Sequence, residues 1–251
     1  MNSKNIEKII TISEVKDPKI SIIIPTLNEE KYLENTLLSL KYQNFKHPYE
    51  IIVSDGKSKD KTIKIAKKYA NKIVICKKRG IAVGRNCGAL VSKGKYLVFL
   101  DADTMLLPNA LSEIYKEIKK KDVALVSFPI VFYKADMINF FYSLVYNSFA
   151  SLTSKTKNPQ IAGMLMAVKR KDFFKIGGFN EELKILEDYD LSKRIAKLGK
   201  VSIVTNSVAI SSARRIDKWG KFKSAIVYPS LYLSYLITKK DIGSKIYKPI
   251  R

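Results

Sequence analysis

Two carboxylates end an apolar run in the middle of the chain. The segment 96–100, YLVFL, is followed directly by Asp101, Ala102 and Asp103. Alternate residues on an extended backbone project to the same side, so the two carboxylates would act together. Two acids repel a phosphate, but Mg²⁺ or Mn²⁺ accepts one or two carboxylates together with the phosphate oxygens of a ligand. Alone, the pattern is a weak signal, because solvent-exposed acids after a strand are common, and a divalent-metal site is its chemical interpretation.

Three more polar segments follow apolar runs that have the composition of strands. PTLNEE follows residues 20–24, SDGKSKD follows 49–53, and KKRGIAVGRNCGA follows 72–76. In open parallel sheets, ligands bind outside the carboxyl ends of the strands. Each segment alone has a structural explanation, such as a helix cap, a turn or close helix packing. Four such segments at one edge of a sheet indicate a binding site.

Segments with helical periodicity separate these strands. We expect helices at 29–42, 59–69, 83–92, 108–120, 138–152, 187–198 and 222–238, and further strands at 123–131 and 163–168. Alternation of strands and helices predicts an α/β fold with a mostly parallel sheet covered on both faces. We expect one domain over residues 1–221, followed by an apolar and basic helical extension over 222–251.

The composition excludes several kinds of chemistry. The chain has one histidine, His47, and two cysteines, Cys76 and Cys87. A Ser-His-Asp hydrolase, a multi-histidine zinc site, a thiolate cluster and a disulfide scaffold are therefore excluded, and Cys76 is expected in the core. With 46 Lys and Arg against 23 Asp and Glu, the net charge is +23. This excess favours polyanionic partners, although lysines on the solvated faces of helices account for much of it.

Several of these motifs also occur in a known order. SIIIPTLNEEKYLENTLLSL, IIVSDGKSKDKT, GRNCGALVSKGKYLVFLDADT and LEDYDLSKRIAKLG together resemble the blocks of the family-2 glycosyltransferases, which are inverting sugar-nucleotide enzymes. The resemblance covers roughly residues 20–215 and rests on several ordered motifs. It implies the GT-A fold, a Rossmann-like, mostly parallel sheet flanked by helices.

The resemblance also implies roles for individual residues. The donor pocket would contain Pro25, Thr26, Asn28, Glu29, Asp55, Arg85 and Asp101. Asp103 would bind Mg²⁺ or Mn²⁺ beside the diphosphate of a UDP- or GDP-sugar. Ser54 stands where many relatives carry an acid, which leaves the identity of the nucleotide open.

The acceptor side is implied by later blocks. Segment 163–183 resembles the acceptor block, in which Gly177 and Gly178 would form a turn that presents Asn180 and Glu181. Asp188 would be the general base, paired with Glu187. Asp190 is the rival base, and an acidic first helical turn that merely favours the helix dipole is the structural alternative. Arg214 and Arg215, in place of the Q-x-x-R-W motif of some relatives, would bind phosphate oxygens of the leaving group or the acceptor.

These roles predict inverting transfer of a sugar to a hydroxyl group on a glycan or a lipid-linked glycan. Transfer to a polyprenyl phosphate is the alternative, and there Asp188 would matter less because that acceptor is already anionic. A nucleic-acid-binding module is a more remote alternative, disfavoured because the basic residues are dispersed and lack an aromatic stacking motif. A catalytically inactive, lectin-like binder is disfavoured by the intact acids.

A membrane surface is the expected location. Segment 222–238, FKSAIVYPSLYLSYLIT, is apolar and rich in tyrosine, is followed by two lysines, and is interrupted by Lys223 and Pro229. It suits an interfacial helix better than a span, and 138–152 would extend the same face. The N-terminus lacks the apolar core of a signal peptide. We expect a cytoplasmic protein, peripheral on the inner face of the cell membrane. In the alternative, both helices pack on the sheet or on a second subunit of a homo-oligomer.

Overall fold

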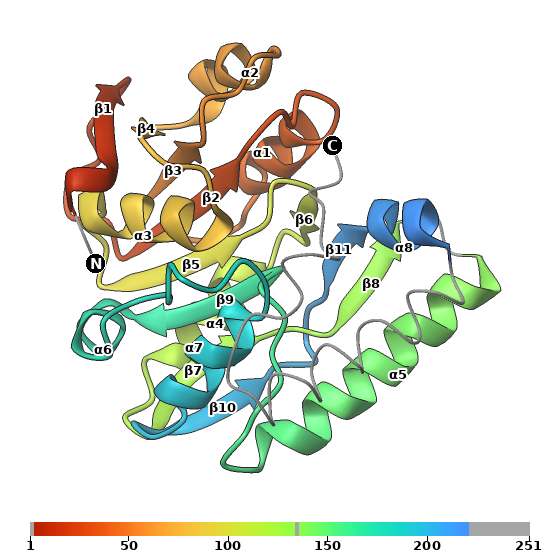
Figure 1. Cartoon of the computed structure of the whole chain (residues 1–251). Helices are drawn as coiled ribbons and strands as arrows, with labels where there is room; N and C mark the ends of the chain where they lie inside the picture. Colours follow the sequence, from red (N-terminus) through yellow and green to blue (C-terminus); the bar gives the residue numbers. More distant parts are fainter. Residues whose placement is uncertain (1–2, 134–135, 221–251) are drawn as a thin grey trace.

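An eight-stranded mixed sheet forms the centre of the molecule (Figure 1). The computed structural model describes residues 3–133 and 136–220, without the side chains of Arg215 and Trp219. The strand order is β1-β4-β3-β2-β5-β9-β7-β10. The predicted α/β architecture is confirmed, whereas the predicted extension 222–251 lies outside the described residues.

The predicted parallel part of the sheet lies in the first half of the chain. Strands β2 (Ile20–Thr26), β3 (Tyr49–Asp55), β4 (Lys72–Cys76) and β5 (Tyr96–Leu100) are parallel to one another. The second half is mixed: β9 (Leu165–Lys169) is antiparallel to both β5 and β7 (Val123–Ser127), and β10 (Lys200–Ile203) is parallel to β7. The N-terminal β1 (Ile6–Thr11) adds an antiparallel edge to β4.

Helices cover both faces because alternate strand residues are buried on opposite sides. In β2, Ile22 and Ile24 belong to a hydrophobic cluster with residues of α1 (Leu33–Lys41), α2 (Thr62–Tyr69) and α4 (Ala110–Ile118). Ile23 belongs to another cluster, with residues of α3 (Ile81–Val91), α6 (Arg170–Lys175) and α7 (Glu187–Ile195). The sheet therefore has a helical layer on each face.

The close contact of α3 with the sheet depends on a glycine. A Cβ atom on Gly88 would lie 2.5 Å from Cγ2 of Ile23. Close helix packing, the structural explanation offered for the segment 77–89, therefore holds at Gly88. Cys76 is 1% exposed, which also confirms its expected place in the core.

A second sheet of three strands lies beside the main one. It has the order β6-β11-β8, from Thr104–Leu106, Ala209–Ser212 and Ile130–Tyr133. The predicted strand 123–131 is thus two strands, β7 and β8, which belong to different sheets. Since β8 and β11 are parallel, the helices that follow them, α5 (Met137–Ser154) and α8 (Arg214–Trp219), begin at the same end of this sheet (Figure 1).

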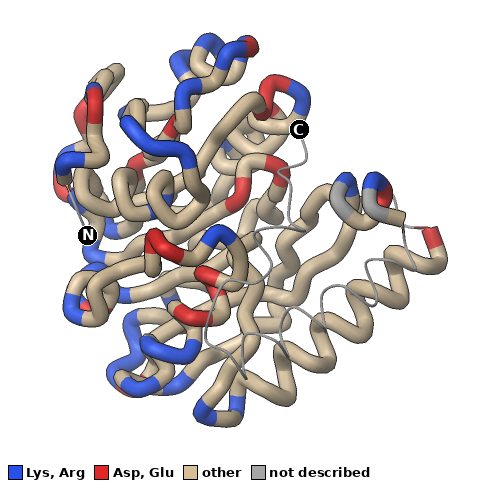
Figure 2. Tube along the Cα trace, viewed as in Figure 1, with Lys and Arg blue, Asp and Glu red and all other residues tan. Residues whose placement is uncertain are grey.

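Charged residues cover the molecule unevenly. Lys and Arg lie on most helices and loops, but the whole of α5 carries no charged side chain (Figure 2). Acidic residues from separate parts of the sequence lie near the centre of the same view. The carboxyl ends of β2, β3 and β5 meet at that edge because the three strands are parallel.

Candidate active site

Two loops at the ends of β2 and β3 are joined by side-chain hydrogen bonds. Asp55 is fully buried and accepts hydrogen bonds from Thr26 Oγ1 at 2.9 Å and from the backbone N–H of Ser58 at 2.8 Å. Asn28 has a positive φ of 56° and accepts at Oδ1 from the backbone N–H of Lys59 at 2.8 Å. A short polar side chain tolerates this left-handed conformation. Thr26, Asn28 and Asp55 therefore fix the shape of this part of the rim.

Arg214 lies between two acids from distant parts of the sequence. Its Nη1 and Nη2 donate to the two carboxylate oxygens of Glu29 at 2.7 and 3.0 Å, and its Nε lies 2.8 Å from Oδ2 of Asp103. The guanidinium also lies 4.8 Å from the ring centroid of Tyr32. Burial raises the pKa of Glu29, and the ion pair with Arg214 opposes that increase.

Arg85 joins a second set of acids from inside the protein. Its side chain is 1% exposed; Nη1 donates to Glu187 Oε1 at 2.7 Å, and Nη2 donates to Asp101 Oδ1 at 2.8 Å. Nη2 also donates to the carbonyl of Gly163 at 2.9 Å. A Cβ atom added to Gly163 would lie 2.3 Å from this nitrogen. Arg85 thus lies inside the protein and holds Asp101 and Glu187 in position through ion pairs.

The first turn of α7 brings Glu187 and Asp188 to this cluster. Leu186, just before the helix, has a φ of 62°, a left-handed conformation that costs a non-glycine residue roughly 1–2 kcal/mol. Oδ2 of Asp188 accepts from the backbone N–H of Gly163 at 2.6 Å. Burial raises the pKa of Glu187 to about 7 and also raises the pKa of Asp188. Neighbouring carboxylates add to both increases, whereas the guanidinium of Arg85 opposes them. A carboxylate with a raised pKa is a stronger general base.

The two acids after β5 have different partners. Residues 101–104 form a turn, in which the backbone N–H of Thr104 donates to the carbonyl of Asp101 at 3.1 Å. The backbone is therefore not extended, and the expectation that both side chains point the same way is wrong. Asp101 pairs with Arg85, whereas Asp103 pairs with Arg214.

The acids at this edge have the right donor atoms for a hard divalent cation. No group of three or more His, Cys, Asp or Glu side chains that could hold a metal ion occurs among residues 3–133 and 136–220. Mg²⁺ typically takes one or two carboxylates and completes its coordination with water and substrate phosphates. Asp103, 10% exposed at the rim, fits that kind of shared site.

The rival base, Asp190, lies in a different environment. Its Oδ2 accepts from Nε and Nη2 of Arg194 at 2.8 and 2.6 Å. Both residues line a cavity of about 550 Å³ together with residues 176–182. Gly177 and Gly178 have φ values of 80° and 73° there, so the predicted glycine turn is confirmed.

Asn86 is a positioning residue that the sequence reasoning did not single out. Its side-chain amide donates to Glu181 Oε1 at 2.9 Å and to the carbonyl of Phe179 at 2.9 Å, and its Oδ1 accepts from the backbone N–H of Phe179 at 3.0 Å. Asn86 holds the predicted acceptor loop against α3. Its place directly after Arg85 in the GRNCG segment was the available signal.

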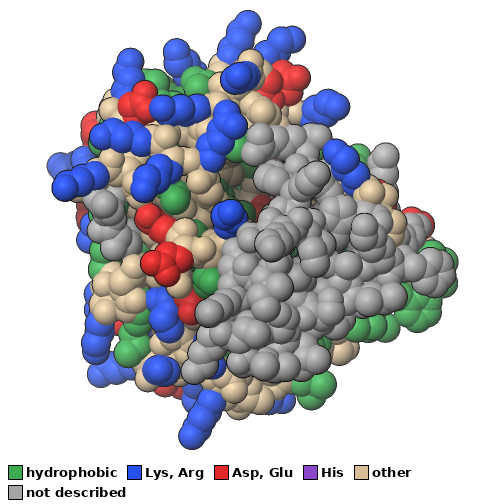
Figure 3. All heavy atoms as spheres, in the orientation of Figure 1, with side chains coloured by type: hydrophobic (Ala, Val, Ile, Leu, Met, Phe, Trp, Pro, Cys, Tyr) green, Lys and Arg blue, Asp and Glu red, His purple; other side chains and the backbone are tan. Residues whose placement is uncertain are grey.

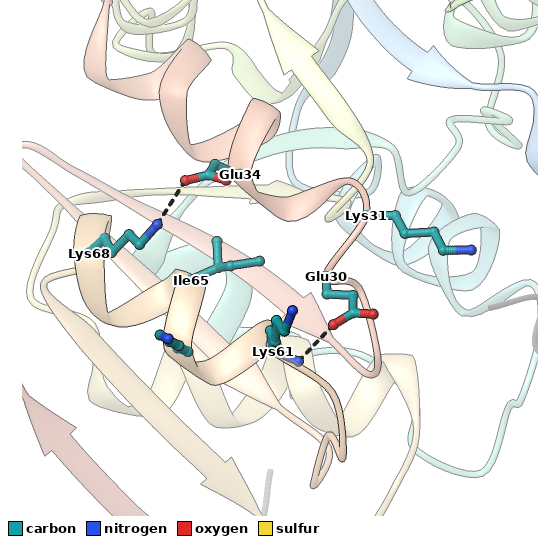
Figure 4. A pocket seen from close by; sticks show the side chains of 7 residues that line it. Glu30, Lys31, Glu34, Lys61, Ile65 and Lys68 are labelled. Atoms are coloured by element: carbon teal, nitrogen blue, oxygen red, sulfur yellow. Dashed lines mark hydrogen bonds and ion pairs between the residues drawn. The ribbon is translucent and has the colours of Figure 1, made fainter.

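Lysines dominate a nearby open groove between α1 and α2. This cavity of about 460 Å³ is lined by Glu30, Lys31, Glu34, Lys61, Lys64, Ile65 and Lys68 (Figure 4). Lys68 forms an exposed ion pair with Glu34 at 3.2 Å. Lys and Arg also predominate on the wider face shown in Figure 3, where acidic side chains gather on one side of a central hollow. The positive potential of these side chains would favour the approach of an anion to this edge.

The buried Arg85 cluster predicts a pH-dependent loss of stability. Arg85→Met should lower the free energy of unfolding by about 3–5 kcal/mol near neutral pH, because buried carboxylates lose their counter-charge. The loss should be smaller near pH 5. Since the pKa of Glu187 is raised from 4.5 to about 7, its proton is bound there and the unpaired charge disappears.

Urea denaturation at both pH values measures this effect. Arg79→Met, which removes a guanidinium from an exposed position, is the matched control and should change stability little. Equal stability of the Arg85→Met variant and the parent protein at neutral pH would contradict the proposed counter-charge role.

Comparisons with known proteins identify the family to which this chain is similar. The family model described as glycosyl transferase family 2 matches residues 21–177, and one described as the N-terminal domain of galactosyltransferase matches 144–217. An uncharacterized glycosyltransferase of Haemophilus influenzae is 29% identical over 180 residues, which are 68% of this chain and 60% of that protein. One of Rickettsia typhi is 32% identical over 198 residues, 73% of this chain and 60% of that protein. The chain thus spans about 60% of the length of these curated relatives.

Two solved structures show the same fold. The mannosyltransferase PcManGT from Pyrobaculum calidifontis, in complex with GDP-Man and Mn²⁺, has a TM-score of 0.64 at 23% identity and covers 79% of this chain and 58% of its own. S. aureus TarS 1-349 in complex with UDP has a TM-score of 0.65 at 20% identity and covers 92% of this chain and 76% of its own. Since the family model spans more than half of the sequence, the chain belongs to glycosyltransferase family 2.

Proposed function

We propose that this protein transfers a sugar with inversion from a UDP- or GDP-sugar to a hydroxyl group on a glycan or a lipid-linked glycan. The observation that carries the proposal is the buried link from Asp101 through Arg85 to Glu187, which sets Asp188 beside the donor edge. Relatives support the donor class, because TarS has been solved with UDP-GlcNAc and PcManGT with GDP-Man.

The donor nucleotide would lie at the carboxyl ends of β2 and β3. Pro25, Thr26, Asn28 and Asp55 form or fix that edge through the hydrogen bonds between the two loops. Asp101, whose side chain is 25% exposed, is the part of the Arg85 cluster that a ribose hydroxyl can reach. In this assignment Arg85 is a positioning residue, because its own guanidinium is almost completely buried.

A divalent cation would be held by Asp103 together with the donor diphosphate. When bound there, Mg²⁺ or Mn²⁺ would supply positive charge that neutralises the departing nucleoside diphosphate. Arg214 would supply a guanidinium group for the phosphate oxygens. The same prediction for Arg215 concerns a side chain outside the described part of the structure. The preorganised positive charge stabilises the leaving group as its bond to the sugar breaks.

Asp188 would act as the general base. Its carboxylate takes the proton of the acceptor hydroxyl while the hydroxyl oxygen forms a bond to C1 of the sugar, and the bond from C1 to the diphosphate breaks on the opposite face. The backbone N–H of Gly163 fixes the carboxylate, and burial raises its pKa toward the working range of a base. An acceptor that is already an anion, such as a polyprenyl phosphate, would need no such base.

We also propose that α5 lies on an anionic membrane surface. Apolar side chains between 43% and 71% exposed occupy one side of this helix: Met137, Ile138, Phe140, Phe141, Leu144, Val145, Phe149 and Leu152. The helix has no charged residue, and Lys155 and Lys157 follow it in a chain with a net charge of +23. Apolar side chains enter the headgroup boundary while lysines meet anionic lipid.

The membrane surface would hold α5 flat. None of the helices in the described ranges is long and apolar enough to cross a membrane. The expectation for 222–238 concerns residues outside the described ranges. An enzyme at the membrane surface meets lipid-linked acceptors directly, which connects this location with the proposed acceptor class.

Loss of the base should slow transfer without loss of donor binding. Asp188→Asn keeps the shape of the side chain and should reduce kcat by about 10²–10⁴-fold, because the amide accepts no proton. Asp190→Asn is the matched control and should retain most of the activity, since Asp190 pairs with Arg194. Transfer rates and calorimetric donor binding measure the two effects. The opposite ranking of the two variants would identify Asp190 as the base, and normal transfer by both would favour an anionic acceptor.

Loss of the metal ligand should abolish transfer. Asp103→Asn should remove the Mg²⁺- or Mn²⁺-dependent activity but keep the fold, because Arg214 keeps its two hydrogen bonds to Glu29. The exposed Asp122→Asn, which breaks a surface ion pair with Lys200, is the control for lost acidic charge. Turnover of the Asp103→Asn variant in EDTA at the parent rate would overturn the metal assignment.

Charges on the apolar face of α5 should prevent vesicle binding. The variant Phe140→Glu/Val145→Glu should co-sediment several-fold less with anionic vesicles than the parent chain, because it places carboxylates in the apolar contact. Ile9→Glu/Ile12→Glu makes the same change on other exposed residues and is the control. Equal sedimentation of the α5 variant and the parent chain would refute the membrane proposal. The proposal would also be refuted if the parent chain bound no vesicles and formed a homo-oligomer that the α5 variant dissociates.

A further inference from the structure

Arg214 occupies the place of a cation between two separated acids. Glu29 follows β2, Asp103 follows β5, and Arg214 opens α8 almost at the end of the described chain. The side chains of Arg214, Glu29 and Asp103 are 19%, 11% and 10% exposed. Arg214 therefore places a positive charge against two poorly hydrated carboxylates, at the rim where the donor diphosphate is proposed to lie.

The guanidinium is held by all three of its nitrogens. Nη1 and Nη2 bind the two oxygens of Glu29 in a fork, Nε faces Asp103, and the flat face covers Tyr32. Such a bidentate geometry is specific for arginine, because a lysine ammonium offers only a point charge. The arrangement is a formed ion-pair site, different from the exposed lysine pairs at the surface.

The backbone at Arg214 is fixed independently of these ion pairs. Strand β11 pairs with β6, and the backbone N–H of Ser212 donates to the carbonyl of Asp103 at 3.2 Å. Thr104 Oγ1 donates to Ser211 Oγ at 2.9 Å next to it. The main chain can therefore stay in place while the long side chain of Arg214 leaves Asp103.

A metal ion and Arg214 compete for the same carboxylate. A divalent ion bound to Asp103 would lie close to the positive guanidinium, and charges at such short separation repel strongly in a partly buried site. The diphosphate of the donor offers both cations further anionic oxygens. Metal without nucleotide should therefore bind weakly, whereas metal together with nucleotide displaces the guanidinium.

We propose that Arg214 is a resident counter-cation that neutralises Asp103 in the empty enzyme and is exchanged for the divalent metal when the nucleotide enters. The released guanidinium stays tethered at Glu29 and is available to the diphosphate. This inference rests on the proposed function, because it takes Asp103 as the metal ligand. It makes metal binding and donor binding cooperative, through one side chain that changes partners.

Binding of Mn²⁺ to the full-length protein tests the exchange without any turnover. Electron paramagnetic resonance counts free Mn²⁺ in titrations with and without UDP or GDP. Without nucleotide, Arg214→Gln should bind Mn²⁺ at least about 10-fold more tightly than the parent, because the competing charge is gone. Arg214→Met removes the same charge but keeps packing on Tyr32, so it gives a second measurement if the glutamine variant does not fold.

Two controls separate competition from a general change in charge. Lys218→Gln removes an exposed positive charge from the same helix and should change the affinity for Mn²⁺ by less than about 2-fold, because water and salt screen it. Asp103→Asn in the Arg214→Gln background should remove the gain. An affinity of both Arg214 variants for Mn²⁺ no higher than that of the parent would overturn the proposal.

The design also distinguishes this inference from the proposed function. If Asp103→Asn abolishes Mn²⁺ binding with nucleotide present, but the Arg214 variants gain nothing without nucleotide, the counter-cation role alone is refuted. If Asp103→Asn leaves Mn²⁺ binding with nucleotide unchanged, Asp103 is not the ligand, and the metal assignment fails together with the inference.

Discussion

The buried guanidinium of Arg85 is the interaction on which the site depends. It lies on α3 and binds Asp101 at the end of β5, Glu187 on α7 and the carbonyl of Gly163 before β9. A charge buried to 1% exposure costs several kcal/mol in lost hydration, and only well-formed partners offset that cost. The cluster therefore joins elements from both halves of the chain and fixes Asp188 relative to the carboxyl ends of the parallel strands.

The backbone conformation of two loops also positions the site. Asn28 and Leu186 both have positive φ, and each directs a loop at the carboxyl edge of the sheet. Leu186 has no polar side chain to favour this conformation, so tertiary contacts hold it. The fully buried Leu191 on α7, packed in one cluster with Phe99 and Phe179, anchors the helix that begins just after it. Strain of this kind persists where surrounding packing over-determines the backbone.

Much of this architecture follows from local sequence, and the rest depends on distant contacts. The runs that form β2 to β5 were predicted because apolar, β-branched segments between amphipathic helices have few alternatives. The short β6, β10 and β11 and the exposed edge strand β1 were missed, since a few residues carry no clear period. The ion pairs of Arg214 were not predictable, because Glu29 and Arg214 are 185 residues apart in the sequence. The motifs identified the acids of the site but not which arginine pairs with which acid.

Because Arg85 and Arg214 pair with different acids, the two arginines have different physical roles. Arg85 is enclosed, so separating it from Asp101 and Glu187 would leave the guanidinium and the Glu187 carboxylate, which are 1% and 6% exposed, without a counter-charge and with little access to water. Arg85 must therefore stay paired for the fold to persist. Arg214 lies at the rim with 19% of its side chain exposed, so water and ligand oxygens can replace its partners one at a time. In the proposed exchange, Arg214 therefore changes partners at a lower cost in free energy than Arg85 would. Asp103 would then pair with different cations, while Asp101 stays paired with Arg85.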